Sequence, residues 1–314
     1  MRVRPLCIFL LLALPLPSWA NSSTGSVNTG GVQYLKSKSI QMYSEDLYIS
    51  KKVIKVDYQF KNLTSGEITE TILFPLPRVP NYSLMDFPYT PNLIKSFKIY
   101  ANGERIIPKV HVRAFKESQG DGAPAMDITD ALKSCGFSDK DLQGPWIDVD
   151  TRKINKQTLR DCKNPIAQQL INESTDPEEV LWESQIIYRW DQTFKANSLT
   201  RIQHEYQPLL GGDIGVPDED WHRRRYCTDR SFIAAVKKTR NEQLQIENLG
   251  YILKTGANWA KPIQNFTLTI ERDPNELISL CWDGKIKKIN PTQFQAVETN
   301  FVPTQDVEIL FVHE

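Results

Sequence analysis

The chain has 314 residues, which is enough for one large domain or two ordinary domains with a substantial core. It carries 38 basic and 38 acidic residues, and this balance argues against a nucleic-acid-binding protein, which normally has a strong basic surplus. Five cysteines are present, and their meaning depends on the compartment in which the chain folds.

The first twenty residues have the pattern of a secretory signal peptide. Two arginines precede an apolar run from Leu6 to Leu16, and the small residues Ser18 and Ala20 stand where signal peptidase recognises its substrate. A transmembrane anchor is the alternative, but this run is shorter than the roughly 20 residues that cross a bilayer. We therefore expect cleavage near Ala20/Asn21 and a periplasmic or secreted mature protein without a transmembrane span.

The region 21–113 is expected to be β-rich. Apolar and polar residues alternate from Ile54 to Phe60, which predicts a half-buried strand. Turn residues follow from Asn62 to Gly66, and the alternation resumes at Ile68 until the prolines of the FPLP motif. We interpret these two strands as a hairpin. Asn102-Gly103 predicts a second hairpin, because this dipeptide tolerates the positive φ angles of a two-residue turn.

Residues 114–182 favour helices over strands. The stretch "DITDALKSCGF" offers Asp127 or Thr129 as an N-cap and Gly136 as a stop. The stretch "NPIAQQLINE" has Pro165 in a first turn, where proline is tolerated. We interpret residues 114–182 as a mostly helical insertion.

Alternating strands return in region 183–314, which is expected to complete the β domain. Two of them, Ser184–Phe194 and Ser198–Pro208, are joined by the turn at residues 195–197. The stretch "DRSFIAAVKKT" predicts a helix with Thr228 or Asp229 as its cap, and further strands continue toward the C-terminus. This pattern, without repeated strand-helix-strand units, indicates a mainly β fold with an antiparallel β-sandwich-like architecture and a small helical insertion.

Export makes disulfides the favoured state of the cysteines. Cys135, Cys162, Cys227 and Cys281 remain after cleavage, and an even number in an oxidising compartment favours bonds over thiols. These four residues allow three pairings. We favour Cys135 with Cys162, which closes a local loop, and therefore Cys227 with Cys281. A zinc site is the alternative, but the spacings do not resemble those of zinc ligands, so no metal is expected.

The sequence contains no recognised catalytic motif. It has no Gly-x-Ser-x-Gly elbow, no phosphate-binding Gly-x-x-x-x-Gly-Lys loop and no His-Glu-x-x-His pair. The four histidines lie far apart, and His204 stands in an alternating strand, where a surface or core role is favoured. Distance in sequence does not forbid a spatial triad, so catalysis is unsupported without being excluded. Catalytic residues are unknown, and no cofactor is indicated.

The segment "DEDWHRRRYCTDR", residues 218–230, is the candidate ligand-binding site. Its candidate residues are Trp221, His222, Arg223, Arg224, Arg225 and Asp229. Arginine binds carboxylates and phosphates in two-point geometry, and backbone N–H groups at a helix start can help to hold an anion. The alternative is a structural loop whose tryptophan covers the core and whose arginines pair with nearby acids.

Three other tryptophans also have two interpretations. Trp190, Trp259 and Trp282 could line a carbohydrate groove, but each lies in or beside a predicted strand. Core packing is therefore the favoured interpretation.

The mature chain resembles a family of bacterial proteins. The motifs that carry the resemblance are "RWDQTF", "EYQPLLGG", "YCTDRSF", "TGANWAKPIQNFTLTI" and "SLCWDGKIKKINPTQF". From about Gly30 to Val312 the chain is similar to the proteins grouped as domain of unknown function 4424 (DUF4424). The resemblance implies an exported bacterial protein with no established activity from which site residues could be transferred. It also supports the pairing of Cys227 with Cys281, whereas Cys135 and Cys162 fall in a more variable block.

We therefore expect an exported β-rich protein that acts as a non-enzymatic binding or interaction module of the bacterial envelope. An envelope protein or cell-wall component would be its partner, bound by a sheet face or by loops on the rigid sandwich. The alternative is an envelope hydrolase or carbohydrate-active enzyme that uses carboxylates such as Asp218, Glu219 or Asp229. The sequence does not specify the ligand or the oligomeric state.

Overall fold

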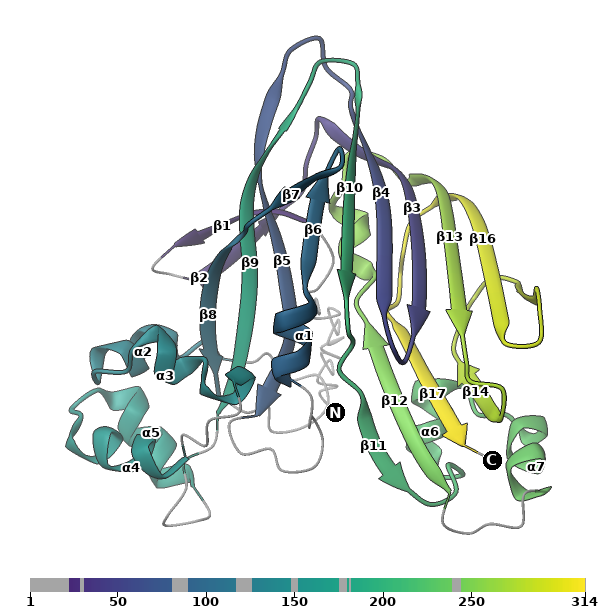
Figure 1. Cartoon of the computed structure of the whole chain (residues 1–314). Coiled ribbons are helices and arrows are strands. Elements are labelled where there is room, and N and C mark those ends of the chain that lie inside the picture. Colours follow the sequence, from purple (N-terminus) through teal and green to yellow (C-terminus); the bar gives the residue numbers. More distant parts are fainter. Residues whose placement is uncertain are drawn as a thin grey trace, which may run out of the picture.

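A computed structural model shows stacked β-sheets with helices on their outer faces (Figure 1). It describes residues 23–28, 31–80, 90–116, 126–147, 152–174, 180, 182–238 and 244–313. The predicted signal peptide, residues 1–20, lies outside the described residues. The mainly β, sandwich-like fold predicted from the sequence is confirmed. Within the described ranges, no helix has the length and apolar character needed to cross a membrane.

The largest sheet in the described part of the chain has eight strands. In spatial order these are β15 (Ile286–Lys288), β16 (Gln293–Phe301), β13 (Ile263–Glu271), β3 (Ile40–Ser50), β4 (Ile54–Asn62), β10 (Leu199–Tyr206), β6 (Lys98–Ala101) and β7 (Glu104–Ile106). Neighbouring strands run antiparallel except β3 and β13, which are parallel.

Two smaller sheets pack on one face of the eight-stranded sheet. The first has the order β2 (Gly31–Leu35), β1 (Ser23–Asn28), β5 (Ile68–Pro80), β9 (Glu183–Phe194) and β8 (Lys109–Phe115). The second has the order β11 (Gly211–Ile214), β12 (Gln245–Tyr251), β17 (Val307–His313) and β14 (Glu276–Leu280). The same face of β4 contacts both: the Phe60 ring lies 6.0 Å from that of Phe194, and the Tyr58 hydroxyl lies 3.1 Å from that of Tyr251. The main core therefore lies between the large sheet and the two smaller ones.

The prediction that the strands after Ile54 and Ile68 form a hairpin is wrong. Both strands exist, but β4 pairs with β3 and β10, whereas β5 pairs with β1 and β9. The chain therefore crosses from the eight-stranded sheet to the five-stranded sheet between β4 and β5. The connection between β9 and β10 crosses between the same two sheets beside it. The side chain of buried Asn62 holds the two crossings together, because its Nδ2 donates to the carbonyl oxygens of Gly66 at 2.8 Å and Phe194 at 3.0 Å. Alternation reveals which side of a strand is buried, but it does not identify the strand's hydrogen-bonding neighbours.

The second predicted hairpin and the predicted helices are confirmed. Strands β6 and β7 pair antiparallel around Asn102 and Gly103, whose φ angles are 50° and 89°. The three predicted helices are α2 (Thr129–Ser134), α5 (Pro165–Glu173) and α7 (Arg230–Lys238). The N-cap position of α2 is Ile128, between the two predicted candidates, and the Asp127 carboxylate accepts a hydrogen bond from the Thr129 N–H at 2.9 Å.

Other short helices were not predicted from the sequence. They are α1 (Thr90–Ser96), α3 (Asp139–Leu142), α4 (Arg152–Asp161), α6 (Asp220–Tyr226) and the 3₁₀ helices η1 (Gly144–Ile147) and η2 (Lys254–Asn258). They are short or strongly polar, so their apolar periodicity is weak.

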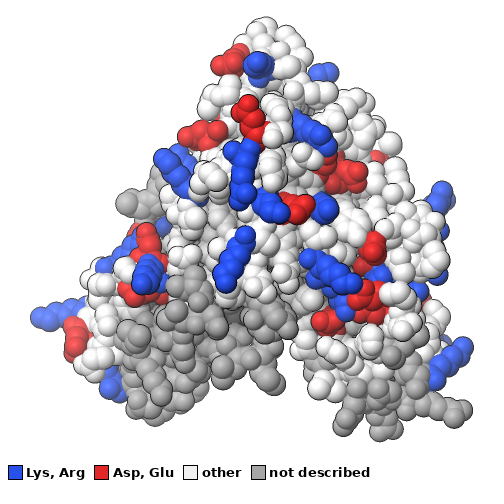
Figure 2. All heavy atoms as spheres, in the orientation of Figure 1, with Lys and Arg blue, Asp and Glu red and all other residues white. Residues whose placement is uncertain are grey.

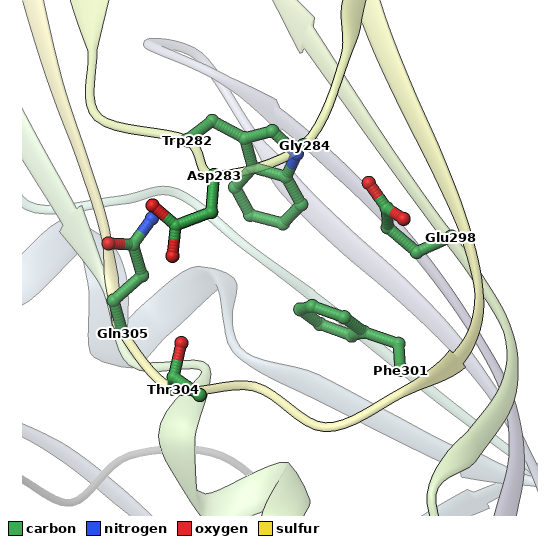
Figure 3. A pocket seen from close by; sticks show the side chains of 7 residues that line it. All are labelled: Trp282, Asp283, Gly284, Glu298, Phe301, Thr304 and Gln305. Atoms are coloured by element: carbon green, nitrogen blue, oxygen red, sulfur yellow. The ribbon is translucent and has the colours of Figure 1, made fainter.

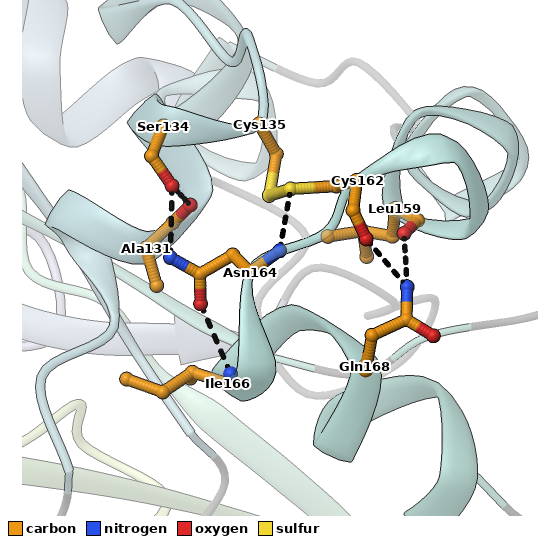
Figure 4. Close-up of a disulfide and its surroundings, with 8 residues drawn as sticks. All are labelled: Ala131, Ser134, Cys135, Leu159, Cys162, Asn164, Ile166 and Gln168. Atoms are coloured by element: carbon orange, nitrogen blue, oxygen red, sulfur yellow. Dashed lines mark hydrogen bonds between the residues drawn. A yellow bond between two sulfur atoms is a disulfide. The ribbon is translucent and has the colours of Figure 1, made fainter.

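Helices cover the outer faces of both smaller sheets. The group from α2 to α5 packs on the five-stranded sheet around Trp182, and α6 and α7 pack on the four-stranded sheet around Tyr226 and Val236 (Figure 1). The predicted bond between Cys135 and Cys162 is present and fastens the end of α2 to the residue after α4 (Figure 4).

Candidate functional site

The candidate segment 218–230 forms α6 and the start of α7. Trp221 is 40% exposed, its ring stacks on that of buried His222 at 3.6 Å, and its Nε1 donates to a carboxylate oxygen of Glu219 at 2.7 Å. Tyr226, at the end of α6, packs into the small core beneath the helices. Part of this segment therefore packs as a structural element, which was the alternative to a ligand-binding role.

Two of the three arginines form ion pairs within the protein. Arg223 contacts Asp220 at 2.7 Å, and Arg225 contacts Glu308 at 3.2 Å, while Arg224 is exposed. Burial raises the pKa of the Glu308 carboxyl group, and the Arg225 charge partly offsets that effect. Binding of an acidic ligand by these arginines stays a prediction.

Asp229 caps α7, one of the two capping residues considered from the sequence. Its carboxylate accepts hydrogen bonds from the Phe232 N–H and the Ser231 hydroxyl, each at 2.7 Å, and these bonds lower the pKa of Asp229. The start of this helix was a candidate for holding an anion, but its Phe232 N–H already donates to Asp229.

The other two carboxylates considered for hydrolysis also have partners in the protein. Asp218 contacts the Lys237 ammonium at 3.2 Å, and Glu219 accepts the Trp221 hydrogen bond already described. Asp218 and Glu219 therefore stabilise the two helices and the turn between them.

The second predicted disulfide connects this segment to the chain that forms a nearby pocket. Cys227, at the left-handed C-cap of α6, is bonded to Cys281, the residue that follows β14. Both predicted disulfides are therefore present. Beyond Cys281 the chain enters one wall of a pocket.

This pocket forms where the chain passes twice between the four-stranded and eight-stranded sheets. One passage leads from β14 to β15 and the other from β16 to β17. The pocket has a volume of about 200 Å³, and its lining residues are Trp282, Asp283, Gly284, Glu298, Phe301, Thr304 and Gln305 (Figure 3). All of them come from one stretch of the sequence, residues 282–305.

Aromatic rings form one side of the pocket. The rings of Trp282 and Phe301 lie 5.8 Å apart, and both pack on the fully buried ring of Phe266. The Trp282 Nε1 atom is buried and has no hydrogen-bond acceptor among the described residues. Trp282 is therefore both a core-packing residue and a pocket residue, whereas Trp190 and Trp259 are buried in the core.

Two carboxylates from different walls complete the pocket. Glu298 lies opposite Phe266 in the pairing of β16 with β13, on the same side of β16 as buried Ala296, and it is half-buried. Asp283 is exposed at the rim. Within the described ranges, neither side chain forms an ion pair or hydrogen bond with another residue of the chain. A half-buried carboxylate beside aromatic rings loses part of its hydration, so a cationic partner would stabilise it.

Gly284 leaves space for the Glu298 carboxylate. A Cβ atom at this position would lie 2.7 Å from Trp282 Nε1 and would collide with an oxygen of Glu298. Any larger residue at position 284 must therefore shift the Glu298 carboxylate, the Trp282 indole or both.

Hydrogen bonds between side chains and the backbone hold the two passages in place. Gln305 Nε2 donates to the Cys281 carbonyl oxygen at 3.2 Å, which joins the two passages directly. Asp306 accepts hydrogen bonds from the backbone N–H groups of Leu253 at 3.0 Å and Lys254 at 3.1 Å. Together with the disulfide, these bonds tie both passages to neighbouring segments of the chain.

A second hollow, of about 290 Å³, lies on the outer face of the eight-stranded sheet. Figure 2 shows basic and acidic side chains interspersed over the region of β10, β4 and β3. Here Arg201 donates to both carboxylate oxygens of Asp57, and Lys98 contacts Glu205 at 3.1 Å. Burial and the nearby Asp57 raise the pKa of Asp46. Most charges in this hollow are compensated internally, which makes it a weaker candidate than the pocket at Trp282.

Asp283, Glu298 and Phe301 were not predicted from the sequence as site residues. One signal was available for Glu298: the alternation of β16 places Phe294, Ala296 and Glu298 on one side, so an acid occupies a core-facing position. No comparable signal marks Asp283, which follows a strand as acidic loop residues commonly do.

Comparisons with known proteins identify the family but no activity. The family profile described as "Domain of unknown function (DUF4424)" matches residues 20–310, so the chain belongs to this family. No curated protein has a significantly similar sequence.

The three solved structures described next are distant likenesses of this chain. A protein of Legionella pneumophila described as a putative nutrient binding protein is 13% identical, with a TM-score of 0.44, and the alignment covers 93% of this chain and 69% of that one. A two-domain M1 zinc metallopeptidase mutant bound to L-tryptophan is 10% identical with a TM-score of 0.30, over 88% of this chain and 44% of that one. An M1 zinc metallopeptidase mutant from Deinococcus radiodurans is 8% identical with a TM-score of 0.26, over 88% and 43%. This chain thus spans less than half the length of the peptidases, and none of these likenesses carries an argument about function.

Proposed function

We propose that this member of the DUF4424 family is a non-enzymatic binding module of the bacterial envelope and that the pocket between Trp282 and Glu298 is its ligand site. In this proposal the chain is exported by the signal peptide at residues 1–20, and residues 114–182 are a helical insertion that packs against the β domain. The two disulfides support folding in an oxidising compartment.

One observation carries the proposal: the pocket combines aromatic rings with carboxylates that have no partner among the described residues. Binding sites typically join an apolar lining to a few polar groups that orient the ligand. A volume of about 200 Å³ is below the roughly 300–1,000 Å³ of sites for drug-sized ligands, so it suits a small molecule or one side chain of a larger partner.

A direct test is an NMR screen of the full mature protein against a mixed library of small cationic, anionic and neutral molecules. We expect hits to change the resonances of residues 282–305, and we expect Trp282→Leu to abolish those changes while thermal unfolding shows that the variant is folded. Hits that map elsewhere, or an absence of hits, would refute the ligand site.

Enzymatic activity is tested in the same preparation. Asp283 and Glu298 are the carboxylates that would serve a hydrolase in this pocket, since glycosidases use two such groups on either side of a bond. We expect no release of reducing sugar from cell-wall glycans. Release that depends on Glu298 would contradict the non-enzymatic part of the proposal.

Export is tested separately by N-terminal sequencing of the protein recovered from the periplasm or the medium. A mature N-terminus near Asn21 would support the proposal, whereas an intact Met1 in the cytoplasm would overturn it.

A further inference from the structure

We propose that the pocket at Trp282 binds a protonated primary amine, R–NH₃⁺, with the Glu298 carboxylate as its counter-ion. This inference rests on the pocket being a ligand site, as proposed above, and it adds the chemical class of the ligand. The amine belongs either to a lysine side chain or to a free small molecule, because both present the same ammonium group on an alkyl chain.

The charges of the lining residues favour a cation. The pocket contains two carboxylates and no basic side chain. Glu298 is half-buried beside Phe266 and Trp282, where partial loss of hydration makes an uncompensated negative charge unfavourable. A bound cation removes that cost, whereas an anionic ligand would increase it.

The hydrogen-bonding groups favour a primary ammonium over a quaternary one. A primary ammonium has three N–H donors and no acceptor. Asp283, Glu298 and Thr304 supply carboxylate and hydroxyl oxygens to the pocket. In Figure 3 the Asp283 carboxylate and the Thr304 hydroxyl lie on one side of the Trp282 indole, and the Glu298 carboxylate lies on the other side. A quaternary ammonium would leave these acceptors without hydrogen bonds.

The aromatic side of the pocket suits the rest of such a ligand. A cation within about 6 Å of an aromatic centroid is attracted to the ring face, and the methylene groups of an alkylamine pack well on apolar rings. The rings of Trp282 and Phe301, 5.8 Å apart, form one continuous apolar surface beside the carboxylates. The pocket therefore has separate areas for the head and the chain of an alkylammonium ion.

The binding test uses three probes of similar size: 1-butylamine, 1-butanol and choline. Each is titrated into the full mature protein at neutral pH, and binding is followed by the indole N–H resonance of Trp282 in protein labelled with ¹⁵N-tryptophan. We expect 1-butylamine to bind at least about tenfold more tightly than either of the others, in line with hydrogen bonds to charged groups. Equal or tighter binding of 1-butanol or choline would overturn the inference.

Matched variants test the role of the carboxylates. We expect Glu298→Gln to weaken binding of 1-butylamine by about tenfold or more. Glu104→Gln is the control, because Glu104 is exposed on β7 at the opposite edge of the same sheet. An equal effect of both substitutions, or an effect of neither, would contradict the inference.

Gly284→Ala gives a variant that keeps every charge. Its new methyl group must displace the Glu298 carboxylate, which is the flexible end of a side chain, and must also shift the Trp282 indole, because Nε1 would lie 2.7 Å away. We expect weaker binding of 1-butylamine by a variant that still unfolds cooperatively on heating. Unchanged affinity would count against a role for the position of this carboxylate.

The outcomes separate this inference from the proposed function. Neutral or quaternary ligands that shift the Trp282 resonance while amines do not would leave the ligand site intact and remove the amine. A pocket that responds to none of the library would remove both. Nα-acetyl-lysine methylamide and 1,4-diaminobutane then distinguish the source: tighter binding of the first supports a lysine side chain of a partner, and tighter binding of the second supports a free amine.

Discussion

Lys51 joins the eight-stranded and four-stranded sheets through an ion-pair network, and its replacement by Met should destabilise the protein. Lys51 lies in the turn between β3 and β4, where its Nζ contacts Glu247 on β12 at 2.6 Å and also contacts Glu276 on β14. Glu276 is only 1% exposed. Lys51→Met would leave this buried carboxylate without its cation.

The expected loss is about 3 kcal/mol in the free energy of unfolding. Removing one partner of a buried ion pair costs about 3–5 kcal/mol, and the lower end applies because Glu276 still accepts the Asp273 N–H at 2.8 Å. If the loss comes from the unpaired charge, the double variant Lys51→Met/Glu276→Gln should recover most of it, since a neutral amide leaves no buried charge.

The network also predicts a dependence on alkaline pH. Burial lowers the pKa of Lys51, but the hydrogen bonds and charges of Glu247 and Glu276 outweigh it, so the net pKa is raised above the model-peptide value of 10.5. A raised folded-state pKa means that the stabilisation is complete below the unfolded pKa and is lost as pH rises through the folded pKa. The wild-type protein should therefore lose stability above about pH 10.5, and Lys51→Met should lose less over that range.

Urea denaturation at neutral and alkaline pH measures these effects. Lys52→Met is the matched control, because Lys52 is 79% exposed and contacts only Asp273 among the described residues, so its replacement should matter much less. The reasoning would be refuted if Lys51→Met cost less than about 1 kcal/mol, or if the double variant were no more stable than Lys51→Met alone.

Three further variants test separate features. His204 is buried, both its ring nitrogens lack hydrogen-bond partners among the described residues, and burial lowers its pKa to about 3. The unfolded chain therefore takes up a proton at His204 that the folded chain does not, so the free energy of unfolding falls as pH decreases from about 6.5 toward about 3. His204→Leu should reduce that fall in urea denaturation at acidic pH, and an unchanged pH dependence of stability would contradict this role of His204. Replacing Cys227 and Cys281 by Ser removes a crosslink with a sequence separation of 54, for which chain entropy gives a loss of about 4 kcal/mol, and denaturation showing less than about 1 kcal/mol would oppose this expectation. Asp229→Ala removes the cap of α7 and should cost about 1 kcal/mol by the same assay, whereas full stability would show that the cap contributes little.

Local features of the fold could be predicted because each depends on a short stretch of chain. Asn102-Gly103 favours the positive φ angles of a tight turn wherever it occurs. Asn164 caps α5 with Pro165 in the first turn, and both preferences act within three residues. The disulfide between Cys135 and Cys162 also closes a short loop inside one region.

The sequence by itself determined that alternating segments such as Ile54–Phe60 and Ser184–Phe194 are strands, which of their sides are buried and, through the count of cysteines, that crosslinks form. The tertiary structure alone decided that β4 and β5 belong to different sheets and that Trp282, Asp283 and Glu298 surround one pocket. The physical reason is that alternation reports only which side of one strand is buried. Strand pairing and pocket formation depend on contacts between distant segments, and the distance between two segments in the sequence does not reveal their distance in space.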